Sequence, residues 1–267
     1  MSCIPSFALV AVSLACVSFE PAVHQAPTPA GAATSAPRHD RAFWKQLAAN
    51  GWRVPAGENV LALASELAAQ LGDTDPELRD EYPYTALTAW LFPEPVLDAA
   101  QRNSLARQLD AQLGRGLGEL GGESVLLRSF SALHLSLLAK SDLDHPFLDD
   151  AAWRAELDRA LAYFAAEKDV RGWVAGSGWH HSVAHTADWL KFLARSPRFT
   201  PADQARVLAA IEAKLAGLDE VLVWGEDERI AQTVVSIVRR DDFDAQAFGE
   251  WLARIEARHA QVWKNQP

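Results

Sequence analysis

The chain has 267 residues, of which 49% are hydrophobic and 22% charged, and 25 basic against 35 acidic residues give a formal charge of −10. This composition excludes wholesale disorder, and the length allows one large or two small domains with a hydrophobic core. The acidic balance argues against a nucleic-acid partner, because neutralising phosphates requires clustered Lys and Arg. The two cysteines, Cys3 and Cys16, are too few for a disulfide framework or a cysteine-based zinc site.

An apolar stretch over residues 4–17 has the length of a signal peptide and is too short to span a bilayer as a helix. Ser13 and Ala15 are small residues at positions −3 and −1 before Cys16, a pattern that resembles a bacterial lipoprotein signal. The resemblance implies that residues 1–15 are removed and that Cys16 is acylated. We therefore expect an exported protein, periplasmic or attached to a membrane of the cell envelope through Cys16. Soluble export without the lipid, a wrongly assigned start and a buried apolar segment are the alternatives.

Residues 16–39 are rich in Pro, Ala, Ser and Thr and contain little apolar bulk to bury. Such a composition favours an extended, solvated tether. Four prolines interrupt it: Pro21, Pro27, Pro29 and Pro37. The sequence thus predicts three segments, which are a signal peptide at 1–15, a tether at 16–39 and an all-helical domain at 40–267.

From residue 40 onward, apolar residues recur at helical spacing, and helix starts are well marked. Asp75-Pro76 places an N-cap before a proline, and Thr200-Pro201 does the same with Asp203 three residues after the cap. Pro83 should break or kink the chain between two of the helices. The pattern predicts helices over residues 41–50, 58–71, 76–82, 84–92, 98–113, 123–140, 150–167, 179–195, 201–216, 226–240 and 245–263.

Strand signals are almost absent from this pattern. Residues 221–224, Val-Leu-Val-Trp, are the one short candidate, and we interpret them as a buried helical turn. Successive helices joined by short loops pair as antiparallel hairpins, in units of about 40 residues. The sequence therefore predicts an all-α, α-solenoid-like fold of helical hairpins, with an irregular helical bundle as the alternative.

The segment 171–189 is unusual, because three glycines and two tryptophans lead into a predicted helix that carries histidines. His181, His185 and Asp188 share one stripe of that helix, and apolar residues occupy the opposite side. If the apolar side packs on the core, the stripe lines a groove together with Trp179. Two imidazoles and a carboxylate at this spacing are a half-site for zinc or another divalent cation.

The zinc-protease helix motif is not supported, because it needs Glu directly after the first histidine and Ser182 stands there. The interpretation that we favour is a buried polar network that only fixes helix packing; the metal half-site, acid–base chemistry and binding of an organic ligand are the alternatives. No glycine-rich phosphate loop and no Gly-x-Ser-x-Gly elbow occurs, which disfavours nucleotide use and a serine nucleophile.

Other polar residues at helix starts could complete the groove. Acidic side chains at helix starts also interact favourably with the positive end of the helix dipole, and this effect alone would explain their presence there. Arg128 lies inside an apolar run, and a buried ion pair with an acid such as Asp80 would explain it. We expect at least two of Asp80, Arg128, Glu226 and Asp227 within side-chain reach of the histidine stripe. The full set of these candidates is Arg79, Asp80, Arg128, Glu226, Asp227 and Arg229.

Four motifs carry a resemblance to a family. They are Arg-Asp-x-Tyr at 79–82, Arg-Ser-Phe at 128–130, Gly-Trp-x-His-Ser-x-Ala-His-x-x-Asp at 178–188 and Glu-Asp-x-Arg at 226–229. Together they resemble a bacterial all-helical domain family of unknown function, over roughly residues 40–261. The resemblance implies an all-α fold and brings no activity, substrate or cofactor.

Three functions are compatible with these features, and one of them is a structural envelope protein whose polar cluster only holds helices together. The function that we favour is a ligand- or protein-binding scaffold of the cell envelope with a groove lined by His, Asp and Arg. The alternative is a metal-dependent hydrolase that uses His181, His185 and Asp188, with a divalent metal as its cofactor.

Overall fold

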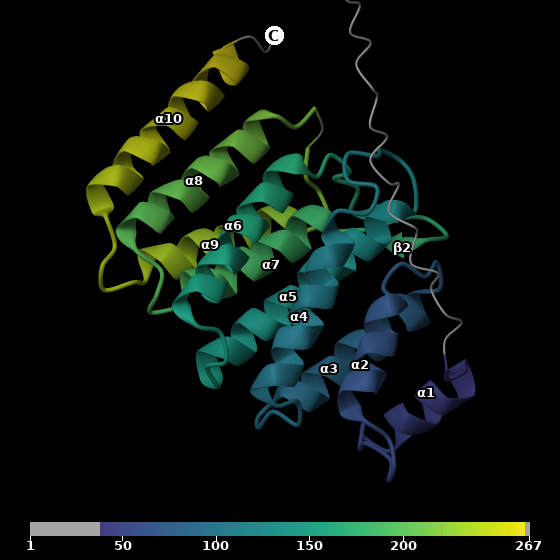
Figure 1. The fold of residues 1–267 in the computed structure, drawn as a ribbon. Helices are drawn as coiled ribbons and strands as arrows, with labels where there is room; N and C mark the ends of the chain where they lie inside the picture. Colours follow the sequence, from purple (N-terminus) through teal and green to yellow (C-terminus); the bar gives the residue numbers. More distant parts are fainter. Residues whose placement is uncertain (1–37, 220, 265–267) are drawn as a thin grey trace, which may run out of the picture. The chain divides into compact units, whose positions relative to one another are not determined.

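The computed structural model describes residues 38–219 and 221–264 (Figure 1), which belong to one compact unit. The expected signal peptide at 1–15, the acylation site Cys16 and all but the last two residues of the expected tether lie outside the described residues. Within the described part of the chain, no helix combines the length and the apolar character needed to cross a membrane.

The described residues form ten α-helices and one two-stranded β-hairpin. A single π-helical turn, η1 (Glu77–Glu81), runs directly into α3, whose first turn contains Pro83. The all-α prediction is confirmed. The α-helices are α1 (Arg41–Ala49), α2 (Val60–Ala69), α3 (Tyr82–Leu91), α4 (Ala99–Leu113), α5 (Ser124–Asp144), α6 (Asp150–Ala166), α7 (Ser182–Ala194), α8 (Pro201–Ala216), α9 (Glu226–Val238) and α10 (Ala245–Lys264).

Local sequence signals account for most helix boundaries. Asp98 and Thr200 each form a capping box with the residue three positions later, at the starts of α4 and α8. The side chains of Asp40, Asn59 and Asp149 accept hydrogen bonds from the first turns of α1, α2 and α6. These caps satisfy amide groups that the helix itself leaves unpaired, so the chain enters each helix at a defined residue.

The helices stack as hairpins in two layers (Figure 1). In one layer α5, α7 and α9 lie side by side, and in the other α8 packs between α6 and α10. Loop-connected neighbours pair across the layers, α4 with α5, α6 with α7 and α8 with α9. This arrangement is the α-solenoid-like stack of hairpins that short loops between helices predict.

Helix α7 is the central helix of the stack, because α5 and α9 flank it and α6 covers it. Every residue of α7 except Phe192 is buried, and Trp189 is completely so. The expectation that one stripe of this helix faces a groove is therefore wrong. The reason is tertiary: neighbours on both sides cover the polar stripe as well as the apolar one.

Two local predictions are also corrected. Helix α7 begins three residues later than residue 179, because β1 (Trp173–Val174) and β2 (Gly178–Trp179) pair as an antiparallel hairpin that leads into it. Residues 221–224 are not a buried helical turn but part of a loop, in which the side chain of Val221 is 82% exposed.

Candidate functional site

The β-hairpin is joined to the start of α7 by backbone hydrogen bonds. The amides of His180 and His181 donate to the carbonyl groups of Gly172 (2.9 Å) and Arg171 (3.0 Å). Gly178 has φ of +87°, a conformation that side chains rarely adopt. His181 itself is left-handed, with φ 47° and ψ 32°. A histidine in this region is strained, and such residues often lie at functional sites.

His181 lies between an aromatic ring and a carboxylate. Its imidazole stacks on Trp179, with ring centroids 4.1 Å apart. Its Nε2 atom is 3.2 Å from the carbonyl oxygen of Trp224 and 3.6 Å from Oε1 of Glu226. Burial lowers the pKa of His181 despite the nearby Glu226. The imidazole is therefore neutral at pH 7, and its Nε2–H donates to the Trp224 carbonyl.

His185 faces α5 rather than a groove. Its Nδ1 atom is 2.9 Å from the hydroxyl oxygen of Ser129 and 3.2 Å from the Ser129 carbonyl oxygen, and its ring meets the edge of Phe130. The same Ser129 hydroxyl donates to the His180 carbonyl. Burial lowers the pKa of His185 well below its usual value. His185 is thus a neutral link between α7 and α5.

Asp188 is held by two cations. Its buried carboxylate accepts from Nζ of Lys191 at 2.5 Å and from the guanidinium of Arg229, which lies on α9. The predicted metal half-site of His181, His185 and Asp188 is wrong, because the carboxylate is occupied and His185 is bonded to α5. Among the described residues, no group of three His, Cys, Asp or Glu side chains could hold a metal ion.

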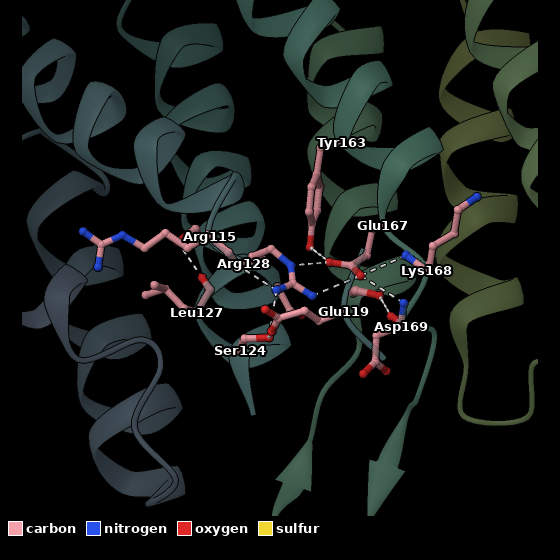
Figure 2. Close-up of polar contacts among 12 residues, drawn as sticks. Arg115, Glu119, Ser124, Leu127, Arg128, Tyr163, Glu167, Lys168 and Asp169 are labelled. Carbon is pink, nitrogen blue, oxygen red and sulfur yellow. Dashed lines mark hydrogen bonds and ion pairs between the residues drawn. The ribbon is translucent and has the colours of Figure 1, made fainter. Parts of the chain in front are cut away.

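Arg128 and Glu167 form a buried ion pair (Figure 2). The Arg128 guanidinium donates to both Glu167 oxygens, at 2.6 and 3.2 Å, and Glu167 also accepts from Tyr163 and from the backbone amides of Lys168 and Asp169. The expected partner of Arg128, Asp80, is not its partner. The pair fixes the segment that leads from α6 into β1.

Arg79 anchors the tip of the hairpin. It is buried, with its guanidinium over the ring of Phe130, and it donates to the carbonyls of Asp73 and Ser177, each at 2.8 Å. Burial lowers its pKa. Its neighbour Asp80 is partly buried, which raises the pKa of the carboxyl.

Of the four residues expected within reach of the histidine stripe, Glu226 is the one with a described contact to it. Glu226 lies next to His181, whereas Asp227 is exposed and neither Asp80 nor Arg128 bonds to the stripe among the described contacts. Arg229, which was a candidate for the groove, reaches Asp188 instead.

An exposed aromatic group lies beside His181. The Trp179 ring contacts Trp173 edge-on at 4.8 Å and Trp224 edge-on at 6.1 Å between centroids. Trp173 is 45% exposed and Trp224 47% exposed. We call Trp173, Trp179 and Trp224 the tryptophan cluster. The sequence analysis names Trp179 as a groove residue and places Trp173 in the unusual segment 171–189, but it does not connect Trp224 with them.

Gly172 lets the tryptophan cluster assemble. A Cβ atom at this position would lie 2.3 Å from the Trp224 ring and 2.6 Å from Oε1 of Glu226. The loop before α9 can therefore approach the hairpin closely only because residue 172 has no side chain.

The fold and the site together define an all-α protein of stacked helical hairpins that presents an aromatic cluster beside a buried His–Glu contact. The chain belongs to the family described as "Protein of unknown function (DUF2785)", whose sequence model matches residues 113–267. The match includes the hairpin, α7 and α9, but it leaves out Arg79 and Asp80, which the resemblance had included. No curated protein and no solved structure is a match for this chain.

Proposed function

We propose that this protein is a lipid-anchored binding module of the cell envelope and that the tryptophan cluster is its recognition surface. The observation that supports the proposal most is the half exposure of Trp173 and Trp224. Large aromatic rings gain binding energy at low entropic cost, and Trp is enriched among the residues that dominate interfaces.

The tryptophan cluster stands on loops that are tied to one another. Arg171 donates to the carbonyl of Gly122 at 2.6 Å, and the amide of Gly121 donates to Asp169 at 3.1 Å. The hairpin is thus bonded to the loop before α5, while Trp224 brings in the loop before α9. Loops held in this way lose little freedom on binding, which favours affinity.

The metal-dependent hydrolase is not carried further. Asp188 would have to release Lys191 and Arg229 before it could bind a cation, and His185 would have to leave Ser129. Breaking a buried, paired charge is costly, so this arrangement favours a structural role for both residues.

Binding can be tested with three probes that stack on indole rings: choline, a chitooligosaccharide and a proline-rich peptide. We expect at least one to bind the full chain, and Trp173→Ala or Trp224→Ala to weaken that binding by about tenfold or more. Isothermal titration measures both. Val96→Ala is the control, because Val96 is 54% exposed in the loop between α3 and α4. Binding of no probe, or unchanged binding in both tryptophan variants, would refute the proposed surface.

The lipid anchor is tested separately. Cells that express the full chain and are fed a labelled fatty acid should yield a labelled protein in the membrane fraction, and Cys16→Ala should remove the label. Cys3→Ala is the matched control, because Cys3 would lie in the removed segment and its loss should leave labelling intact. An unlabelled protein in the soluble fraction would contradict the anchor and leave the binding surface untouched.

A further inference from the structure

We propose that the tryptophan cluster binds a quaternary ammonium group, so that the ligand is cationic and alkylated. This inference rests on the proposed binding function and names the chemical class of its ligand. It is carried by two independent observations, an unpaired buried carboxylate and a set of indole rings beside it.

The carboxylate is that of Glu226, the first residue of α9. The residue is only 1% exposed. Its Oε2 atom accepts the backbone amide of Trp224 at 2.9 Å, whereas Oε1 is buried and has no hydrogen-bond donor among the described residues. Burying a carboxylate without a cationic partner is unfavourable. A cationic ligand beside Glu226 would supply the missing partner.

The contacts of Glu226 leave this charge uncompensated. Among the described residues, the basic side chain at ion-pair distance is His181, whose Nε2 atom lies 3.6 Å from Oε1, and that imidazole already donates to the Trp224 carbonyl. Because burial lowers the pKa of His181, the imidazole stays neutral at pH 7. The positive end of the α9 dipole offers only a fraction of a unit charge.

The nearby arginines are committed elsewhere. Arg229 pairs with Asp188, and Arg171 pairs with Asp169. Arg79 is buried against backbone carbonyls, where its pKa is lowered. None of the three forms an ion pair with Glu226 among the described residues.

A second carboxylate flanks the hairpin. The side chain of Glu123 is 50% exposed, accepts from the Ser177 hydroxyl at 3.3 Å and lies 3.8 Å from Nε2 of His180. Within the described part of the chain it has no Lys or Arg partner at ion-pair distance. Glu226 and Glu123 are thus two carboxylates near the hairpin without a Lys or Arg at ion-pair distance among the described residues.

The indole rings of the tryptophan cluster determine which kind of cation can bind there. The face of an indole carries negative quadrupole charge, and Trp is the strongest cation–π partner among the side chains. Trp173 and Trp224 each stand near a right angle to Trp179, at 74° and 79°. Rings in different planes can meet several sides of a rounded, weakly hydrated group. A quaternary ammonium has that shape, and its methyl groups tolerate apolar contact.

The test compares choline with its neutral isostere, 3,3-dimethyl-1-butanol, by isothermal titration on the full chain. We expect choline to bind at least about tenfold more tightly than the isostere. Glu226→Gln should remove most of that preference by weakening choline alone. Glu228→Gln, the same change at an exposed position two residues later, should keep it. Thermal melts show whether each variant is folded, and if Glu226→Gln is not, the comparison of the two ligands on the unaltered chain decides.

The group could be a lipid headgroup or part of a soluble molecule. Full-length Cys16→Ala protein mixed with phosphatidylcholine or phosphatidylglycerol vesicles separates these sources. If the protein floats with phosphatidylcholine vesicles but not with phosphatidylglycerol vesicles, and added choline abolishes the flotation, the ligand is a lipid headgroup. If the protein binds choline but floats with neither kind of vesicle, the ligand is part of a soluble molecule.

Failure of this inference differs from failure of the proposed function. Equal affinity for choline and its isostere, or a choline preference that survives in folded Glu226→Gln, overturns the cationic ligand. Binding of the chitooligosaccharide or the peptide but not of choline also overturns it, and the tryptophan cluster then remains a recognition surface. Binding of no probe overturns both.

Discussion

Arg128→Met is expected to lower the free energy of unfolding by about 3–5 kcal/mol. Methionine fills most of the space of the arginine stem but leaves the buried Glu167 carboxylate without its cation. Loss of one partner of a buried pair costs more than the pair contributes, because the remaining charge cannot reach water. Urea denaturation followed by circular dichroism measures the change.

Two further variants show whether the unpaired Glu167 charge causes the loss of stability. Arg206→Met should change stability by no more than about 1 kcal/mol, because its pair with Asp158 is exposed on both sides and its second acceptor, the buried Asp203, keeps its bonds from Arg154 and Thr200. The double variant Arg128→Met/Glu167→Leu also lacks the buried Glu167 carboxylate, so it should regain much of the stability that Arg128→Met loses. If the free energy of unfolding of Arg128→Met lies within about 1 kcal/mol of that of the unaltered chain, Arg128 is not essential to the fold.

Stability is expected to fall as the pH is lowered from about 6.5 to about 4. His134 is fully buried on α5, where its Nδ1–H donates to the Phe130 carbonyl at 2.7 Å, and burial lowers its pKa to about 4. Between these values the unfolded chain binds a proton that the folded chain excludes. The contribution of neutral His134 to the free energy of unfolding is fully present above pH 6.5. It falls progressively toward pH 4, by roughly 3 kcal/mol. Burial also lowers the pKa values of His180, His181 and His185, which act in the same direction.

Urea midpoints between pH 7.5 and 4.5 test this expectation. His134→Asn should be less stable at pH 7.5 but should flatten the slope, whereas His145→Asn, at a partly exposed position, should keep it. Asp110 acts in the opposite direction, because burial raises the pKa of its carboxyl to about 7 and acidification then favours the folded state. The difference between the unaltered chain and His134→Asn at each pH cancels this effect. An unchanged slope in His134→Asn would contradict the assignment to His134.

The candidate site could be predicted only in part. The segment 171–189 was singled out by its glycines, tryptophans and histidines, and His181 does lie beside Trp179 and Glu226. The spacing of His181, His185 and Asp188 says which residues share a helix stripe, but not what packs over that stripe. Because α5 and α9 cover it, His185 and Asp188 became internal links instead of ligands.

The all-α class and most helix boundaries follow from local sequence, because both depend on neighbours within a few residues. The capping boxes at Asp98 and Thr200 complete themselves within three residues of the cap. Helical periodicity likewise needs no distant partner.

Contacts between residues on different helices of the stack depend on packing and could not be predicted from local sequence. The pairing of Arg128 with Glu167 rather than Asp80, and the contact of Trp224 with Trp179, join positions about 40 residues apart through helix packing. The β-hairpin has strands of two residues each, too short for an alternating pattern to show. Exposure of Trp173 and Trp224 is likewise set by what other loops leave uncovered, and no local pattern of residues carries that information.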